Sequence, residues 1–249
     1  MTTQDFASFD GARLRYDIEG DGRTVLMLHG FLANTQFNWV DPGVAAAIKA
    51  AGFRIVMLDF RGHGRSAAPT DAAAYPPDVL ARDAEALIAH LDLADYDLVG
   101  YSLGARIAVR MLARGARPRR CVLGGLGDSG VVAAAQRMAF FADAIRNGEQ
   151  SQFPQAAKVI HAMMANAGLD PQVMLHVLDS QRETAAAELA RIGTPTLVVA
   201  GAADADNGSA EGLAALLANA RAERVPGNHL TAVRSPELAQ AIVRFLREA

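Results

Sequence analysis

The sequence predicts an α/β protein with one mostly parallel sheet of about eight strands, helices on both faces of the sheet and an inserted helical cap. Three observations lead to this fold class. Short, unbroken apolar runs alternate with longer segments whose apolar residues recur at helical spacing. A strand-like run enters a helical segment through a tight turn at residues 100–104. Between two strand candidates, about 60 residues carry helical periodicity alone, which is too long for one crossover connection.

The composition favours a single large domain with an insertion. The chain has 249 residues, of which 51% are hydrophobic and 20% are charged, and it contains no Pro/Ser-rich linker. We therefore expect a core domain formed by residues 1–128 and 192–249, with residues 129–191 inserted as the cap.

Charge and cysteine content exclude several function classes. A formal net charge of −3, with one short basic cluster at Arg117–Arg120, gives no electrostatic footprint for nucleic acid or an acidic membrane. No signal-peptide pattern and no window of ~20 apolar residues are present, so we expect a cytoplasmic protein without a membrane partner. The single cysteine, Cys121, lies in an apolar run and is expected to be a buried strand residue. No ligand spacing for a metal is present, and we expect no metal and no cofactor.

The strands and helices alternate along most of the chain. Phe6–Phe9 and Arg13–Ile18 flank Asp10-Gly11, a dipeptide that favours a hairpin, and are predicted to be edge strands. The further strands are expected at Thr24–Leu28, Phe53–Leu58, Tyr96–Val99, Arg120–Leu126, Thr196–Ala200 and Ala222–Val225. Core helices are expected over residues 42–51, 79–91, 105–112, 210–218 and 236–247. This alternation predicts parallel strands joined by right-handed crossovers.

The segment predicted to form the cap reads as four helices, at residues 133–147, 153–167, 171–180 and 184–191. Most of its apolar residues are expected to pack the cap on itself and on the sheet, and a few to line an adaptable pocket. From this group we assign Phe141 and Met163 to substrate binding. His161 and His176 are interpreted as packing or surface histidines.

Ser102 is the candidate nucleophile. It lies at the apex of Gly100-Tyr101-Ser102-Leu103-Gly104, where a turn from strand directly into helix forces an unusual backbone conformation and leaves no room for neighbouring Cβ atoms. Such a turn exposes the hydroxyl above the carboxyl edge of the sheet, with the N-terminus of the next helix beneath it. The alternative reading of Ser102 is a simple helix cap.

Asp204 and His229 are the candidate partners of the serine, because each follows a different strand at the same edge of the sheet. A serine hydroxyl needs a base within hydrogen-bond reach, and the base needs a carboxylate that fixes its tautomer. Asp206, two residues farther along, and Asp128, after the preceding strand, stay open as alternative acids.

Backbone amides near Ser102 are expected to bind an oxyanion. The strand Thr24–Leu28 ends in His29-Gly30-Phe31, where a glycine lets the backbone approach a substrate, and we assign the oxyanion donors to the amides of Phe31 and Leu103. Substrate contacts are also assigned to Gly30, Tyr101 and Asn34. Asn38 lies in the same polar loop and is left open, because polar loop residues often satisfy their own backbone.

Five motifs give the chain a resemblance to the α/β-hydrolases along nearly its whole length. They are His29-Gly30-Phe31, Asp59-x-Arg61-Gly62-His63-Gly64-x-Ser66, Gly100-x-Ser102-x-Gly104, Gly201-x-x-Asp204 and Gly227-Asn228-His229. The order Ser, Asp, His along the chain is the order found in that superfamily. Within it, the chain looks like the small bacterial serine esterases and lactonases with a short helical cap. The second motif, including His63, is interpreted as a structural turn.

The resemblance and the candidate residues together predict a hydrolase of small carboxylic esters or lactones that works through an acyl-enzyme. Alternatives on the same three residues are carbon–carbon bond hydrolysis, amide hydrolysis and cofactor-free perhydrolysis. A further alternative is a ligand-binding protein that has lost turnover. Epoxide-hydrolase chemistry is not expected, because relatives of that kind place Asp where Ser102 stands. The expected partner is a small-molecule ester or lactone, and the chain is expected to be a monomer or a homodimer.

Overall fold

The computed structural model describes residues 1–248. It contains one eight-stranded sheet in the order β1-β2-β4-β3-β5-β6-β7-β8. The strands are β1 (Thr2–Ala7), β2 (Arg13–Glu19), β3 (Thr24–Leu28), β4 (Arg54–Asp59), β5 (Tyr96–Tyr101), β6 (Cys121–Gly124), β7 (Thr196–Gly201) and β8 (Ala220–Val225). β2 pairs antiparallel with both β1 and β4, and the remaining neighbours are parallel. The predicted fold class is confirmed.

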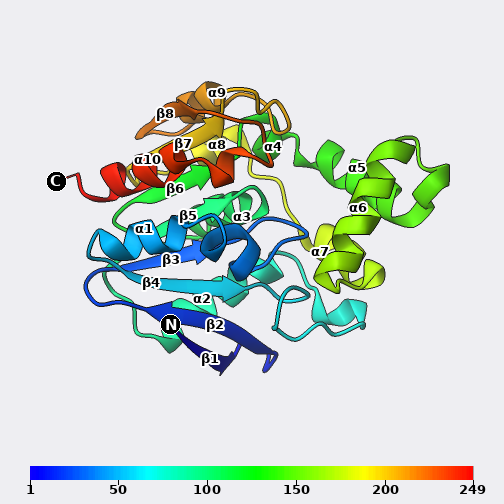
Figure 1. The fold of residues 1–249 in the computed structure, drawn as a ribbon, viewed down its shortest axis with the longest axis horizontal. Coiled ribbons are helices and arrows are strands. Elements are labelled where there is room, and N and C mark those ends of the chain that lie inside the picture. The colour runs from blue at the N-terminus through cyan, green and yellow to red at the C-terminus, as the bar shows by residue number, and fades with distance from the viewer. Residues whose placement is uncertain (249) are drawn as a thin grey trace.

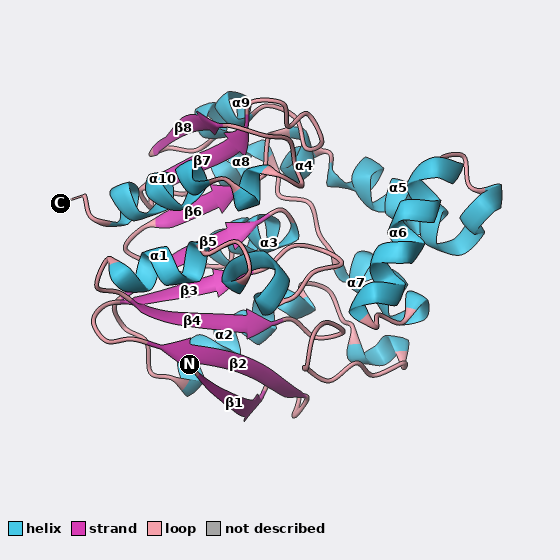
Figure 2. Ribbon diagram, in the orientation of Figure 1, coloured by secondary structure: helices cyan, strands magenta, loops and turns pink. Residues whose placement is uncertain are grey.

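Helices cover both faces of the sheet (Figures 1 and 2). The core helices are α1 (Val44–Ala50), α2 (Val79–His90), α3 (Leu103–Ala113), α9 (Ala210–Leu216) and α10 (Pro236–Leu246). α1 and α10 contribute Ile48, Ile242 and Phe245 to one buried cluster, while α2, α3 and α9 contribute to the cluster on the opposite face. The short helical turns are Gln36–Val40, a π-helical turn, and the 3₁₀ turns Ala72–Ala74, Gly148–Gln150 and Ala232–Arg234.

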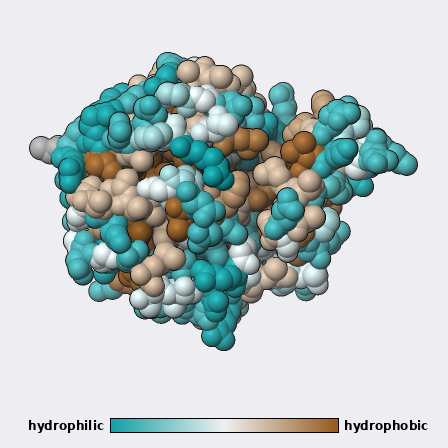
Figure 3. Space-filling view, in the orientation of Figure 1, coloured by the Kyte–Doolittle hydropathy of each residue, from teal (hydrophilic) through white to brown (hydrophobic). Residues whose placement is uncertain are grey.

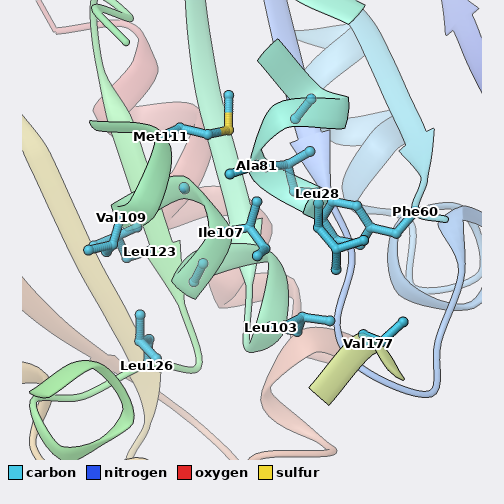
Figure 4. Packing of buried hydrophobic residues seen from close by; sticks show 14 of the residues in the cluster. Leu28, Phe60, Ala81, Leu103, Ile107, Val109, Met111, Leu123, Leu126 and Val177 are labelled. Atoms are coloured by element: carbon cyan, nitrogen blue, oxygen red, sulfur yellow. The ribbon is translucent and has the colours of Figure 1, made fainter. Parts of the chain in front are cut away.

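The central strands are apolar on both faces because both are covered. In β3, Val25 and Met27 belong to the cluster under α1 and α10, whereas Leu26 and Leu28 belong to the other. Figure 4 shows the second cluster, where Leu28 lies with Ile107 and Met111 of α3. This packing places the carboxyl ends of β3, β5, β6, β7 and β8 at one edge, which is where the candidate residues follow.

Five helices lie between β6 and β7 in the chain. They are α4 (Ser129–Val132), α5 (Ala134–Asn147), α6 (Pro154–Ala167), α7 (Pro171–Ser180) and α8 (Ala186–Leu189). Figure 1 shows α5, α6 and α7 standing beyond the carboxyl edge of the sheet, whereas α4 and α8 contact α3 of the core. The division into a core and a cap of residues 129–191 stays a prediction. None of the helices in residues 1–248 has the length and hydrophobicity needed to cross a membrane.

Several element boundaries differ from the expected ones. The first strand is Thr2–Ala7 instead of Phe6–Phe9, because Thr2–Gln4 pair with Tyr16–Ile18 of β2. β6 ends at Gly124 instead of Leu126, since the chain turns at Gly125 with φ +60°. The last helix of the predicted cap shortens from 184–191 to Ala186–Leu189.

The Asp59–Ser66 turn is held together by its own side chains. Asp59 accepts hydrogen bonds from the backbone N–H groups of Thr35 and Arg65, at 2.9 and 3.0 Å. The fully buried Arg61 guanidinium pairs with Asp10 and Asp83. Burial lowers the pKa of His63 to about 3, so its imidazole is neutral. His63 therefore lies inside the turn, where its Nδ1 contacts the backbone carbonyl of Arg61, and it forms no hydrogen bond with Ser102.

Candidate active site

Ser102 lies between β5 and α3 with an unusual backbone conformation, φ 53° and ψ −111°. Its N–H donates to the carbonyl of Gly124 at the end of β6, at 2.8 Å. A Cβ at Gly100 would overlap the backbone carbonyl of Gly104, and a Cβ at Gly104 would overlap the carbonyl oxygen of Leu28. The two glycines therefore let β5, α3 and β3 approach closely enough to hold the serine in its strained position.

His229 and Asp204 join Ser102 in one hydrogen-bonded chain. The distance between His229 Nε2 and Ser102 Oγ is 2.9 Å, and that between His229 Nδ1 and Asp204 Oδ2 is also 2.9 Å. Their loops are locked to each other, since Ala203 N–H donates to the carbonyl of Gly227. A base with one nitrogen on the serine and the other on a carboxylate is the arrangement that activates a hydroxyl nucleophile.

The environment keeps the Asp204 carboxylate ionised. Burial by itself raises the pKa of Asp204, but the hydrogen bond and charge of His229, together with Arg137, leave it below its ordinary value. Asp204 Oδ1 also accepts the backbone N–H of Asp206 at 3.1 Å. A carboxylate in this position stabilises an imidazolium on His229 when the histidine accepts a proton.

Neither alternative acid contacts His229. Asp206 Oδ2 forms an ion pair with Arg137 at 2.8 Å. Asp128 Oδ1 accepts the backbone N–H groups of Ser129 and Ser209, at 2.8 and 2.9 Å. Of the three aspartates left open by the sequence, only Asp204 lies within hydrogen-bond distance of the histidine.

The amides of Phe31 and Leu103 are free donors beside the serine. Within residues 1–248, neither backbone N–H has a hydrogen-bond acceptor. Leu103 is the first residue of α3, where the backbone N–H groups have no partner inside the helix and the helix dipole favours a negative charge. Phe31, Leu103 and Ser102 line the same small cavity of about 20 Å³. This is the placement that an oxyanion site requires.

A larger cavity of about 400 Å³ opens above Ser102, between the core and the helices α5 and α6. Gly30, Tyr101, Phe141 and Met163, all assigned to substrate contacts from the sequence, line it. The Phe31 and Phe141 rings, which both line it, contact each other edge to face with centroids 5.1 Å apart. Figure 3 shows apolar residues gathered at this junction, and the exposed hydrophobic residues Phe37, Val159 and Leu230 lie at the cavity. A cavity of about 530 Å³ near residues 188–194 touches none of the candidate residues.

Tyr101 supports the histidine loop as well as lining the cavity. Its hydroxyl donates to the backbone carbonyl of His229 at 2.7 Å, and the two rings lie 5.7 Å apart. Burial raises the pKa of Tyr101, so the phenol stays protonated and keeps this hydrogen bond. The residue before Ser102 thus holds the His229 loop in place.

The assignment of Asn34 to substrate binding stays a prediction. Asn34 Oδ1 accepts the N–H of Phe37 at 2.9 Å, and Asn34 does not line the cavity, because its short polar side chain bonds to the nearest free backbone donor. Asn38 lines the cavity instead. Its Oδ1 accepts the N–H of Gly30 at 2.9 Å, and its buried Nδ2 has no partner within residues 1–248.

Sequence reasoning does not single out Arg106 and Arg137, although both lie beside Ser102. They line the small cavity of about 20 Å³, and Arg137 also lines the larger one. The signal available for Arg106 is its place one helical turn after Ser102, on the face of α3 that is buried with Leu103 and Ile107. For Arg137 the sequence offers no comparable signal, since the position of α5 depends on tertiary packing.

Comparisons with known proteins agree with this fold. Residues 23–122 match the family described as the alpha/beta hydrolase fold. An epoxide hydrolase of Caballeronia sordidicola is 38% identical over 96 residues, which are 39% of this chain. The aligned part spans only 28% of that relative's own length.

Two solved structures are similar over nearly the whole chain. A hydrolase from Pseudomonas aeruginosa PA01 has a TM-score of 0.76 and 25% sequence identity, and the match covers 99% of this chain and 98% of the other. The enol-lactonase from Burkholderia xenovorans LB400 has a TM-score of 0.74 and 25% identity, with 98% and 100% covered.

Proposed function

Because the chain belongs to the α/β-hydrolase superfamily, we propose that it hydrolyses small carboxylic esters or lactones through an acyl-enzyme on Ser102. The observation that supports this most directly is the hydrogen-bonded chain from Ser102 Oγ through His229 to Asp204, with both links at 2.9 Å. Epoxide hydrolysis, the activity in the name of one relative, is not proposed, since a serine instead of an aspartate stands at the nucleophile position.

In the proposed reaction, each of the hydrogen-bonded residues has a defined task. Ser102 Oγ attacks the acyl carbon while His229 Nε2 takes its proton, and the amides of Phe31 and Leu103 donate to the oxyanion that forms. The protonated His229 then gives the proton to the leaving alkoxide, and the acyl–oxygen bond breaks. Water, deprotonated by His229, then attacks the ester on Ser102; the bond from the acyl carbon to Ser102 Oγ breaks, His229 returns the proton to Oγ, and the acid is released.

The cavity supports a substrate with an apolar body of modest size. A volume of about 400 Å³ lies at the lower end of ligand pockets in proteins. Its lining is mostly apolar, with Phe140, Ile160 and Met163 supplied by α5 and α6. The similar enol-lactonase from Burkholderia xenovorans LB400 is consistent with a lactone or an ester as the substrate class.

The proposal is tested by labelling the protein with a fluorophosphonate and measuring turnover of 4-nitrophenyl esters of two to eight carbons. We expect a single adduct, mapped to the peptide with Ser102, and turnover of the esters. Labelling without turnover of any ester or lactone would favour a non-catalytic binding protein. If Ser102 is not labelled, the proposed nucleophile is wrong.

Asn38 is expected to position the segment that carries the oxyanion donor. Replacing Asn38 by alanine removes the acceptor of the Gly30 N–H and frees the adjoining Phe31 amide to move, so we expect kcat for 4-nitrophenyl esters to fall about 10- to 100-fold. Asn34→Ala, in the same loop but outside the cavity, is the matched control and should stay within a few-fold of the wild type. Equal effects of the two changes would remove Asn38 from this role.

A further inference from the structure

Arg106 is a buried cation without a carboxylate. Its side chain is in α3, and the residue is only 7% exposed. Its Nε donates to the carbonyl of Gly130 at 2.8 Å, and within residues 1–248 no acidic group pairs with it. Arg61, a guanidinium that is fully buried, is paired with both Asp10 and Asp83. Buried charges in proteins are normally paired. A buried Arg106 without an acidic partner is therefore expected to bind an anion from outside the chain.

A second guanidinium approaches the same place from α5. Arg137 lies 5.0 Å from the ring centroid of Phe141 and forms its ion pair with Asp206, whose side chain is 46% exposed. A guanidinium has five N–H donors, and the ion pair with Asp206 uses only some of them. The other N–H groups of Arg137 are available to bind a ligand. Burial, and after it the charge of Arg137, lowers the pKa of Arg106 to about 10, so the Arg106 guanidinium is still charged at neutral pH.

The two arginines face the reacting centre. Both line the cavity of about 20 Å³ that Ser102, Phe31 and Leu103 also line. This space has room for one water molecule or one oxygen atom of a ligand. It adjoins the larger apolar cavity, since Phe31, Ser102, Arg137 and Phe141 line both. A water molecule would satisfy hydrogen bonds there, but it would not neutralise the charge of Arg106.

We propose that the substrate carries a free carboxylate, which lies in the larger cavity against Arg137 and directs one oxygen toward Arg106, while its ester or lactone carbonyl lies at Ser102. For the reaction this inference rests on the proposed function, but the anion site itself can be tested without turnover. Guanidinium groups match a carboxylate through paired N–H donors, and a desolvated site strengthens such bonds. The apolar cavity would hold the rest of the molecule.

The first test compares two esters that differ only in charge. These are mono-4-nitrophenyl glutarate, which is an anion at neutral pH, and its methyl ester, which is not. We expect kcat/KM to favour the anion by about 10- to 100-fold, the value of a hydrogen-bonded ion pair. In Arg137→Gln the anion should lose far more than the neutral ester, so that the preference falls close to one.

Arg146→Gln is the matched control. Arg146 is an exposed arginine of the same helix that lines neither cavity, so its removal changes the net charge equally and should leave the preference intact. For Arg106→Gln, the same two kcat/KM values are measured together with the melting temperature. The melting temperature is needed because this change also removes the hydrogen bond to Gly130 and can lower stability. Hydrolysis of both esters at equal kcat/KM by the wild type would overturn the proposal.

A binding measurement separates this inference from the proposed function. In Ser102→Ala, isothermal titration should give tighter binding of monomethyl glutarate than of dimethyl glutarate, and Ser102→Ala/Arg137→Gln should lose the difference. If the wild type hydrolyses neither aryl ester, the hydrolase proposal fails, yet this difference would still support the anion site. Equal binding of the two compounds overturns the anion site whatever the turnover.

Discussion

Ser102→Ala is expected to reduce turnover of 4-nitrophenyl esters by on the order of 10⁶-fold, because the acyl-enzyme can no longer form. The proposed oxyanion donors, the amides of Phe31 and Leu103, remain in the variant, so a small residual rate above that in water should persist. The measurement is the initial rate with purified protein, compared with a blank without protein. Fluorophosphonate labelling should disappear together with the turnover.

The fold should survive this change. Alanine carries the same Cβ as serine at the strained φ of 53°, so the backbone cost does not increase. The melting temperature should therefore lie close to that of the wild type. Ser129→Ala, at an exposed serine at the start of α4, is the control for loss of a hydroxyl and should keep full activity. Substantial activity in Ser102→Ala would assign the nucleophile elsewhere.

Asp204→Asn is expected to lower kcat about 10⁴-fold, although the amide has nearly the same shape as the carboxylate. The asparagine amide would donate to His229 Nδ1, which places the imidazole proton on Nε2 and leaves no acceptor for the Ser102 hydroxyl. The fall should appear in kcat more than in KM, because Asp204 acts through the histidine.

Asp128→Asn provides the comparison for this second prediction. Asp128 Oδ1 accepts two backbone N–H groups, and an asparagine oxygen can replace it there. We expect Asp128→Asn to keep turnover within a few-fold of the wild type. Near-normal rates in Asp204→Asn would move the acid to one of the two alternatives that the sequence leaves open.

The sheet and the candidate residues at its edge were predictable because they follow from local rules. Apolar runs such as Thr24–Leu28 are covered on both faces, and polar residues after parallel strands meet at one edge. Ser102, Asp204 and His229 each follow a different strand, so topology alone brings them to the same edge. The exact acid was less predictable, since Asp204 and Asp206 lie two residues apart in one loop, and only the bonds of that loop decide which carboxyl faces His229.

The parts that the sequence did not predict depend on contacts between distant segments. Thr2–Gln4 are polar and show no alternation of apolar residues, and their pairing with β2 makes them part of a strand. Asn34 and Asn38 are equivalent by composition, but only the second reaches Gly30. Arg106 reads as a polar residue on an amphipathic helix, and its burial becomes visible only when α4 covers it.

In the turn at Ser102, the residues that the backbone geometry requires differ from the residue that is proposed to react. The steric demand falls on Gly100 and Gly104, where any side chain would overlap backbone atoms, while the side chain at position 102 lines a cavity and contacts His229. An evolving or engineered chain can therefore exchange the nucleophile itself for another small reactive residue without rebuilding the turn. The two glycines have no such freedom, so the reaction class can diverge in this scaffold while the geometry that presents it stays the same.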